Sequence, residues 1–238
     1  MNSSGQSLDL DFDTLRCLDI SLAEKLASFS RWENSNFPEF GVLYRELVER
    51  LTSSSAGENA LKTGSSVPSI ILPDADGHLI DVPKLLSSGP LVISFNRGYW
   101  CPYCKLELLA LANIYPQIQE LGAQVISITP QRAPATNKLA ETCDLPFSIL
   151  CDLDNSYALL CGLMMSQGSD IVEALSNFGV DLGSDQGSKG GFLPIPATYV
   201  INPEGLVVAH YIHPDFRTRM VPEDILKALQ LINPDSLP

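Results

Sequence analysis

Long apolar runs are missing from this sequence. No stretch approaches the ~18 consecutive apolar residues that a membrane-spanning helix needs, so we expect no membrane contact. The first six residues also lack the basic start and the apolar segment of a secretory signal. We therefore expect a cytoplasmic protein.

Positive charge is scarce as well. Lys and Arg together number 15 against 28 Asp and Glu, which gives a formal net charge of −13. A protein with this charge repels the phosphates of nucleic acids and of anionic membranes. We therefore expect neither of them as a partner.

The six cysteines form no repeated pattern. Cys101 and Cys104 are separated by two residues, and no second CxxC and no CxxH accompanies them. A structural zinc site needs four such ligands, and small secreted proteins carry cysteines throughout, so we expect no metal, no other cofactor and no disulfide framework. Cys151 and Cys161 flank an expected strand-to-helix turn; a second exchange pair is open to them, but buried free cysteines are the favoured interpretation.

The cysteine pair stands between an apolar run, 91–95, and a stretch with helical spacing of apolar residues that ends near Leu121. A strand that leads into a helix in this way places the thiols beside unpaired N–H groups and the positive end of the helix dipole. The pKa of a free thiol is about 8.5, and in CxxC motifs it can fall to ~7 or below. The motif therefore predicts a redox site, in which Cys101 is the exposed, acidic nucleophile and Cys104 is its shielded partner.

The chain divides by pattern into two parts, residues 1–60 and residues 61–238. We expect residues 1–17 to be loosely ordered, and two helices, which begin near Ser21 and Phe40, to form a helical N-terminal extension. A lid, a contact in a homodimer and a plain cap are roles open to this extension, and a plain cap is the favoured interpretation. The second part alternates strands and helices: a hairpin over 67–82, a strand, helix and strand over 91–129, a helix over 133–143, a strand over 146–150, a helix over 155–163, a hairpin over 197–212 and a last helix from 221.

A stretch rich in Gly, Ser and Asp interrupts this alternation at about 164–193. Loops of such length are uncommon inside compact domains. We interpret the stretch as a surface insertion that contains one short amphipathic piece, 171–178. The remaining order of elements is that of an α/β protein with a thioredoxin-like fold, in which helices flank a central mixed sheet.

Several motifs resemble known families. Residues 98–105, Gly-Tyr-Trp-Cys-Pro-Tyr-Cys-Lys, resemble the WCxxCK core of thioredoxins, and the inner CPYC is the tetrapeptide of glutaredoxins. The surrounding sequence resembles the peroxiredoxin-like branch of the AhpC/TSA (alkyl hydroperoxide reductase/thiol-specific antioxidant) family. The pieces that carry this second resemblance are 64–68, 72–77, 95–101, 145–147 with 151–152, and 199–205.

The resemblance implies a thiol peroxidase. Cys101 would attack a hydroperoxide and become a sulfenic acid, Cys104 would resolve it as a disulfide, and a thioredoxin- or glutaredoxin-type thiol donor would reduce the pair. A protein thiol-disulfide oxidoreductase with a disulfide substrate is the alternative. A redox-sensing protein, with the N-terminal helices as its partner surface, is a third interpretation.

The chain departs from peroxiredoxins at two positions. Members of that family carry a Thr three residues before the reactive Cys and an Arg before a late strand, where this chain has Gly98 and Pro196. Pro196 resembles the cis-proline of thioredoxins, so we expect a cis bond between Ile195 and Pro196. One lost hydrogen-bond donor costs about 10²–10³ in rate in comparable sites, so we expect a slow peroxidase.

Other residues complete the predicted site around Trp100 of the motif. Arg97 could hold the thiolate or a peroxide anion. Arg132 follows the expected strand 124–129, at the edge of the sheet where sites form. Glu107 stands where related reductases keep an acid, although a solvated helix carboxylate is an equally good interpretation. The charged residues before the last helix are interpreted as its salt-bridged lead-in: Asp215, Arg217 and Arg219.

Overall fold

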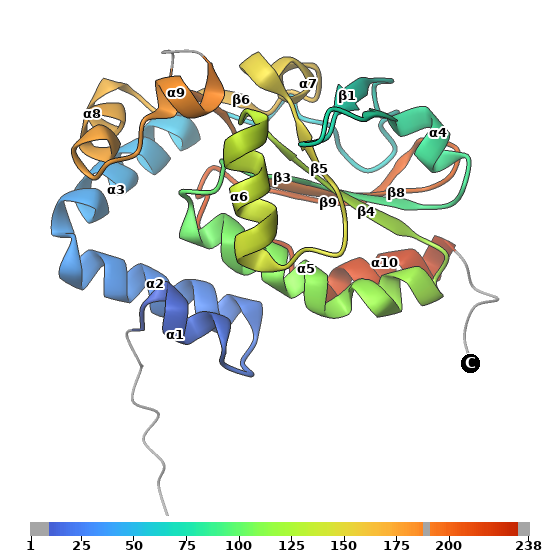
Figure 1. Ribbon diagram of the computed structural model, residues 1–238, viewed down its shortest axis with the longest axis horizontal. Coiled ribbons are helices and arrows are strands. Elements are labelled where there is room, and N and C mark those ends of the chain that lie inside the picture. Colours follow the sequence, from blue (N-terminus) through green and yellow to red (C-terminus); the bar gives the residue numbers. More distant parts are fainter. Residues whose placement is uncertain (1–9, 188–190, 233–238) are drawn as a thin grey trace, which may run out of the picture.

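The computed structural model describes residues 10–187 and 191–232, and its centre is a five-stranded mixed sheet (Figure 1). The strand order is β5-β4-β3-β8-β9. Strand β3 pairs in parallel with β4 and antiparallel with β8, which confirms the expected mixed sheet. The strands are β3 (Leu91–Phe95), β4 (Gln124–Thr129), β5 (Ile149–Cys151), β8 (Ala197–Ile201) and β9 (Val207–Ile212).

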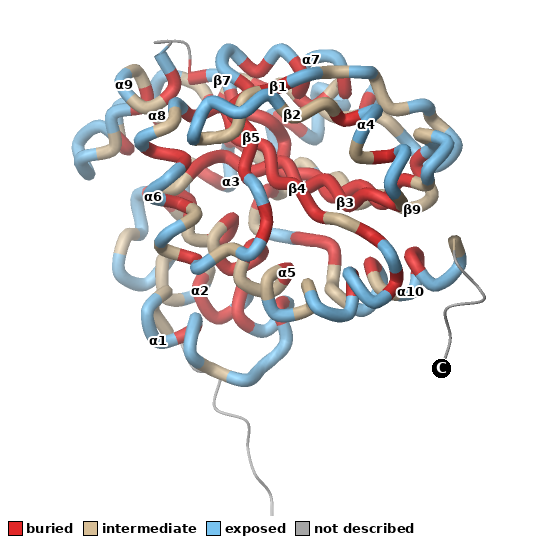
Figure 2. The backbone as a smooth tube through the Cα atoms, turned by 45° about the vertical axis from the view of Figure 1, so that its right-hand side comes forward, coloured by how far each residue is buried: buried red, intermediate tan, exposed pale blue. Residues whose placement is uncertain are grey.

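Both faces of the sheet are covered, and this explains the uninterrupted apolar sequence of β3. Leu91 and Ile93 pack on one face and Val92 on the other. Figure 2 shows the buried strands running through the middle of the molecule. Three helices cover the Val92 face: α5 (Pro102–Glu120), α6 (Ala133–Cys143) and α10 (Pro222–Ile232). The other face is covered by β1 (Ile71–Pro73), β2 (Leu79–Asp81), α4 (Val82–Leu86) and α7 (Ser156–Leu160). A 3₁₀ turn, Leu153–Asn155, precedes α7.

The N-terminal extension contains α1 (Phe12–Arg16), α2 (Leu22–Asn36) and α3 (Pro38–Ser53). Ser21 begins α2 through a reciprocal capping box with Glu24, as the sequence predicts. The expectation of a loosely ordered start is wrong for α1, because Asp11 caps this helix and Leu15 is completely buried. Residues 1–9 lie outside the described part of the chain.

The stretch 164–193 contains β6 (Met164–Ser166), α8 (Ser169–Asn177), α9 (Leu182–Gln186) and β7 (Phe192–Pro194), and β6 and β7 pair antiparallel. Apolar residues of α8 belong to the same buried cluster as those of α2, α3 and the start of α5. Figure 1 shows α3 and α8 side by side at one end of the sheet. The stretch therefore helps to build the core at the end of the sheet where the cysteines lie.

The Ile195–Pro196 bond is trans, since the described residues contain no cis peptide bond, and the expected cis bond is wrong. Here the chain passes from β7 into β8, and the Ile195 N–H donates to the Leu163 carbonyl at 2.7 Å. An extended residue before a proline is an ordinary conformation. Pro196 itself is buried.

No helix in the described ranges has both the length and the apolar character to cross a membrane.

Candidate active site

The CxxC pair lies at the start of α5. Cys101 is the N-cap residue, and its Sγ accepts a hydrogen bond from the Cys104 N–H at 3.4 Å. The Cys104 Sγ donates to the Cys101 Sγ across 2.8 Å. The first turn of the helix therefore brings the two sulfurs together and points an amide at the first of them, as the sequence predicts.

The two thiols differ in acidity. Burial acts to raise the pKa of Cys101, but the hydrogen bond from Cys104 and the Arg97 and Arg219 guanidinium groups outweigh it and lower this pKa to about 6. Burial and the neighbouring Cys101 sulfur raise the pKa of Cys104. The expected division into an acidic and a less acidic thiol is confirmed in its direction.

The expected exposure of Cys101 is wrong. Its side chain is only 1% exposed, about as buried as Cys104. The N-terminal helices and α8 explain this burial, because their apolar residues share one buried cluster with the CxxC pair. These elements therefore restrict access to the sulfur.

Arg97 is buried beside the pair, as the sequence predicts for a supporting cation. Its guanidinium lies 3.9 Å from the centre of the Phe216 ring and 4.7 Å from that of Trp100. Its Nη2 donates to the Gln167 Oε1 at 3.0 Å. Aromatic faces attract a cation, so the rings stabilise a charge that burial alone would disfavour.

A second buried cation, Arg219, contacts the pair at Cys104. Its Nη2 donates to the Cys104 Sγ at 3.4 Å, and its Nε forms an ion pair with Glu107 at 2.6 Å. Glu107 is 2% exposed and accepts a hydrogen bond from the Thr198 hydroxyl, so the solvated interpretation of this carboxylate is wrong. Burial raises the pKa of Glu107, while Arg219 and Thr198 favour its charged form.

Sequence reasoning missed the role of Arg219. Of the three residues interpreted as a lead-in to the last helix, Arg217 does pair with Asp215, at 2.8 Å. Arg219 instead contacts a cysteine 115 positions earlier in the chain. Only its apolar surroundings, Phe216 and Met220, hint in the sequence at a buried position.

The structure does not bring Arg132 to the cysteines. This residue is the N-cap of α6 with an exposed side chain, and it is not among the charges that lower the Cys101 pKa. The end of β4 instead delivers its neighbour Gln131, whose Oε1 accepts the Tyr99 N–H at 2.7 Å. Gln131 is buried and is a further residue that the sequence did not indicate.

Gln131 explains why a glycine precedes the motif. Gly98 has a φ of +126°, and a Cβ there would lie 2.6 Å from the Gln131 Cδ. Side chains avoid both this backbone conformation and such a contact. A threonine at this position would therefore be strained and would have to displace the Gln131 side chain.

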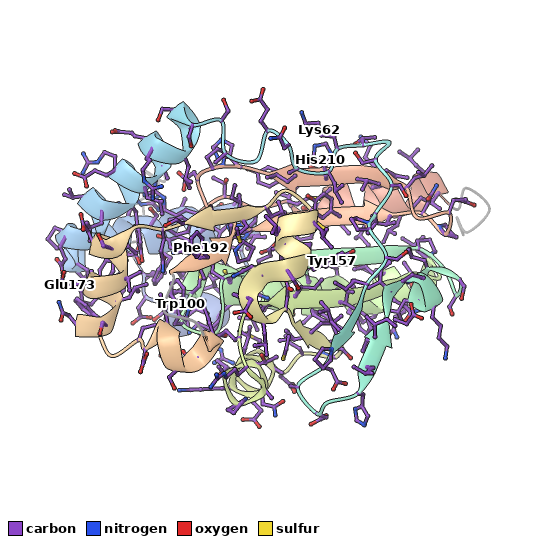
Figure 3. All side chains as sticks on the ribbon, turned by 90° about the horizontal axis from the view of Figure 1, so that it is seen from above. Lys62, Trp100, Tyr157, Glu173, Phe192 and His210 are labelled. Atoms are coloured by element: carbon purple, nitrogen blue, oxygen red, sulfur yellow. The ribbon has the colours of Figure 1, made fainter. Side chains whose placement is uncertain are left out.

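A pocket of about 210 Å³ opens onto Cys101. Its walls come from the motif, from α2 and α3 of the extension, and from α8 and the residues after it. Tyr103 of the CPYC motif donates to the Glu33 Oε2 of α2 at 2.6 Å, which ties the extension to the motif. Figure 3 shows Trp100 at the same end of the molecule as α8, which carries Glu173.

Cys151 and Cys161 are buried free thiols, as expected. Burial raises the pKa of both, that of Cys161 to about 12. The Cys151 Sγ lies 3.4 Å from the Thr136 hydroxyl. Thiols with raised pKa values are poor nucleophiles at neutral pH.

A model of the AhpC/TSA family matches residues 63–210, which is more than half of the chain. The chain belongs to the AhpC/TSA family. Helices α1–α3 precede the matched residues. The family membership agrees with the resemblance that the motifs indicated, and it joins the buried, acidic Cys101 to a family of cysteine-based redox proteins.

Curated relatives of this AhpC/TSA protein carry two kinds of name. It is 25% identical over 154 residues to the "Thiol-disulfide oxidoreductase ResA" of Bacillus subtilis, with 64% of this chain and 69% of that one covered. It is 24% identical over 147 residues to the "Putative peroxiredoxin bcp" of Helicobacter pylori, with 62% and 85% covered. The AhpC/TSA protein is thus an oxidoreductase.

Solved structures confirm the thioredoxin-like fold of this AhpC/TSA protein. The peroxidoxin BcpB of Mycobacterium tuberculosis aligns with a TM-score of 0.57 at 21% identity, over 73% of this chain and 99% of that one. Peroxiredoxin 6 of Arenicola marina aligns with a TM-score of 0.58 at 15% identity, over 71% and 72%. At such identities the likeness concerns the fold.

Proposed function

We propose that this protein is a thiol peroxidase that reduces small hydroperoxides at Cys101. The observation that carries the proposal is a buried thiol with a pKa of about 6, which lies beside Arg97 and opens onto a pocket of about 210 Å³. A thiolate is the nucleophile in peroxide reduction, and a small pocket admits a small oxidant. The relatives named as peroxiredoxins support this proposal.

The reaction uses both sulfurs in turn. The Cys101 thiolate attacks the terminal oxygen of the hydroperoxide, the O–O bond breaks, and the alkoxide leaves and takes up a proton to become an alcohol. Cys101 is now a sulfenic acid. Cys104 attacks the Cys101 sulfur across the present distance of 2.8 Å, the S–O bond breaks, water leaves, and a disulfide forms.

A thiol donor then restores the pair. Two donor thiols reduce the disulfide to Cys101 and Cys104 thiols and become a disulfide themselves. Since the Cys101 sulfur is buried, the closed pocket admits a low-molecular-weight thiol, whereas a thioredoxin- or glutaredoxin-type donor requires the covering helices to move. Arg97 and Arg219 stabilise the Cys101 thiolate of the reduced enzyme.

A protein thiol-disulfide oxidoreductase is the second candidate. The CPYC pair, the absent threonine at Gly98 and the ResA relatives favour it. Disulfide exchange needs only a thiolate, access and a good leaving thiol. Of these three requirements, access is the one that the buried Cys101 does not meet.

The test is peroxide turnover with dithiothreitol as donor, in wild type and in two cysteine variants. We expect Cys101→Ser to abolish turnover. Cys104→Ser, treated with one equivalent of hydroperoxide in the absence of dithiothreitol, should consume one peroxide and keep one added oxygen on Cys101 in the mass spectrum, because the resolving thiol is gone. Cys17→Ser, at an exposed cysteine away from the site, is the control and should keep full activity. Peroxide consumption no faster than by free cysteine would overturn the proposal.

We place the enzyme in the cytoplasm. Unclustered cysteines beside a single CxxC are typical of proteins in a reducing compartment. Fractionation of cells that express the intact protein tests this location, and recovery outside the cytoplasm would overturn it.

A further inference from the structure

The pocket at Cys101 is walled by aromatic rings from two segments that are far apart in the sequence. Phe178, which ends α8, lies edge-on to Phe37 and to Phe40 with ring centres 5.3 Å and 5.0 Å apart. Phe29 and Trp32 of α2 line the same space. Aromatic rings prefer edge-on and tilted contacts of this kind, so the ring of a bound ligand can pack in the same way against the aromatic side chains of the pocket.

The size of the pocket limits the ligand. An apolar cavity of about 150 Å³ holds a benzene ring. Sites for drug-sized molecules begin at about 300 Å³. The present volume of about 210 Å³ therefore suits one ring with a short substituent.

Two residues that line this pocket each carry a buried hydrogen-bond donor without a partner in the part of the chain that the structure describes. The Arg97 Nε and the Trp100 Nε1 are both shielded from solvent and have no hydrogen-bond partner among the described residues. An unpaired buried donor destabilises the folded protein, so a ligand that supplies an acceptor gains affinity by pairing with it. The oxygens of a hydroperoxide are such acceptors.

We propose that the pocket formed by α2, α3 and α8 selects small aromatic hydroperoxides as the oxidant of Cys101. The ring would lie against Phe37, Phe40 and Phe178, and the peroxide oxygens would face Cys101. Arg97 and Trp100 would donate to those oxygens, in place of the threonine and arginine that peroxiredoxins use. This assignment rests on the proposed peroxidase function and names its substrate class.

Binding can be measured apart from catalysis. The chain has two tryptophans, Trp32 and Trp100, and both line the pocket, so the intrinsic fluorescence reports on it directly. Cumyl alcohol is the product of cumene hydroperoxide and does not oxidise thiols. We expect a saturable fluorescence change with cumyl alcohol and none with tert-butanol at the same concentrations.

Variants locate the binding. One aromatic pair is worth about two- to tenfold in affinity, so Phe178→Ala should weaken cumyl alcohol binding by that factor. Phe192→Ala removes an equally large, partly exposed ring from β7 (labelled in Figure 3). Phe192 is not among the residues that line the pocket, so this variant should leave binding unchanged. Should Phe178→Ala fail to fold, Val180→Phe narrows the same pocket and should weaken binding as well.

Rates complete the test. We expect pre-reduced protein to be oxidised about tenfold faster by cumene hydroperoxide than by tert-butyl hydroperoxide. Phe178→Ala should lose this preference, whereas Phe192→Ala should keep it. Equal rates with the aromatic and the branched hydroperoxide, or no saturable binding of cumyl alcohol, would overturn the selectivity alone. Rates no faster than those of free cysteine with every hydroperoxide would overturn the peroxidase proposal, and this one with it.

Discussion

Arg97 helps to lower the pKa of the nucleophile, and it forms no ion pair with a carboxylate among the described residues. Its Nη2 is held by Gln167, and its guanidinium lies over Phe216, Trp100 and, more distantly, Tyr44. A carboxylate in that place would neutralise the charge that acts on Cys101. The aromatic faces keep the cation buried and leave its field directed at the sulfur.

Replacement of Arg97 should shift the pH dependence of Cys101. With a pKa of about 6, the wild-type thiol is half ionised near pH 6 and almost fully ionised at pH 8. In Arg97→Met the pKa rises, because a positive charge that favours the thiolate is gone. If it rises by one unit, iodoacetamide alkylation at pH 6 falls about fivefold and alkylation at pH 9 is unchanged.

Arg97→Lys is the matched control, since it keeps the charge and loses the planar guanidinium. Its inflection should lie between those of wild type and Arg97→Met. The measurement is the pH profile of alkylation of the Cys101 peptide by mass spectrometry. An unchanged inflection in Arg97→Met would contradict the role assigned to this cation.

Gly98 is the second residue with a testable constraint. A side chain here needs an unfavourable φ and displaces Gln131, so Gly98→Thr should destabilise the protein by about 2 kcal/mol. For a chain of this size this corresponds to a fall in Tm of about 4–8 °C. Restoring the threonine of peroxiredoxins should therefore bring no gain in peroxide rate.

Gly77→Ala separates the cost of the unfavourable φ from the cost of the contact with Gln131. Gly77 also has a positive φ, +87°, but nothing lies within 4 Å of an added Cβ. The fall in Tm of Gly77→Ala therefore measures the backbone cost alone. It should be smaller than the fall in Tm of Gly98→Ala, which adds the same methyl group next to Gln131. A Gly98→Thr protein with wild-type Tm and a faster peroxide reaction would contradict the steric argument.

At the scale of elements, the extension contacts the rest of the chain through an apolar cluster and several polar contacts, one of which reaches the CPYC motif. Tyr103 reaches α2 through its hydrogen bond to Glu33, while Phe29 lies edge-on to the Tyr103 ring with centres 5.1 Å apart. Tyr103 is also the third residue of the CPYC motif. Movement of α2 is therefore coupled to the turn that carries both cysteines.

Loss of the Tyr103–Glu33 hydrogen bond should loosen the cover over Cys101. We expect Tyr103→Phe to raise the rate of Cys101 alkylation at pH 8, where the thiol is ionised in wild type, because the helix above it opens more often. The coupling energy from a double-mutant cycle with Glu33→Gln, measured by urea unfolding, should be about 1–2 kcal/mol.

Equal alkylation rates in wild type and Tyr103→Phe, with no coupling energy, would show that α2 does not restrict access. Ser156→Ala is a suitable control, because it removes a hydroxyl from α7, on the other face of the sheet.

The elements that local sequence signals define were predictable. The strand 91–95, the helix behind the CxxC and the capping box at Ser21 each carry their signal within a few residues. The burial of Cys101 was not predictable, because it depends on apolar faces of α2, α3 and α8 that meet only in the folded chain. The contact of Arg219 with Cys104 was not predictable for the same reason, since only tertiary packing brings the two residues together.

At the scale of the whole molecule, charge is distributed unevenly. The chain has a net charge of −13, yet two buried arginines, Arg97 and Arg219, lie at the redox pair. Exposed acidic groups act on the sulfur through solvent and salt, whereas the buried cations act at short range with little screening. The acidic composition therefore does not oppose a thiolate at Cys101.

The helices that cover Cys101 bear differently on the two candidate functions, because they limit the size of the substrate that can reach the sulfur. A buried sulfur under an aromatic pocket accepts a small oxidant, and a protein disulfide must first displace α2, α3 or α8. The same pair of sulfurs can carry out either reaction. Substrate size is therefore the property in which the two functions differ most clearly.

The most direct measurement compares both substrates in one single-turnover experiment. Reduced protein at pH 7.5 is mixed with a hydroperoxide or with insulin, and formation of the Cys101–Cys104 disulfide is followed by tryptophan fluorescence and mass spectrometry. The account predicts that the hydroperoxide oxidises the pair about a hundredfold faster than it oxidises free cysteine, and that insulin is reduced no faster than by dithiothreitol. Rapid reduction of insulin, with hydroperoxide consumption equal to that of free cysteine, would contradict it.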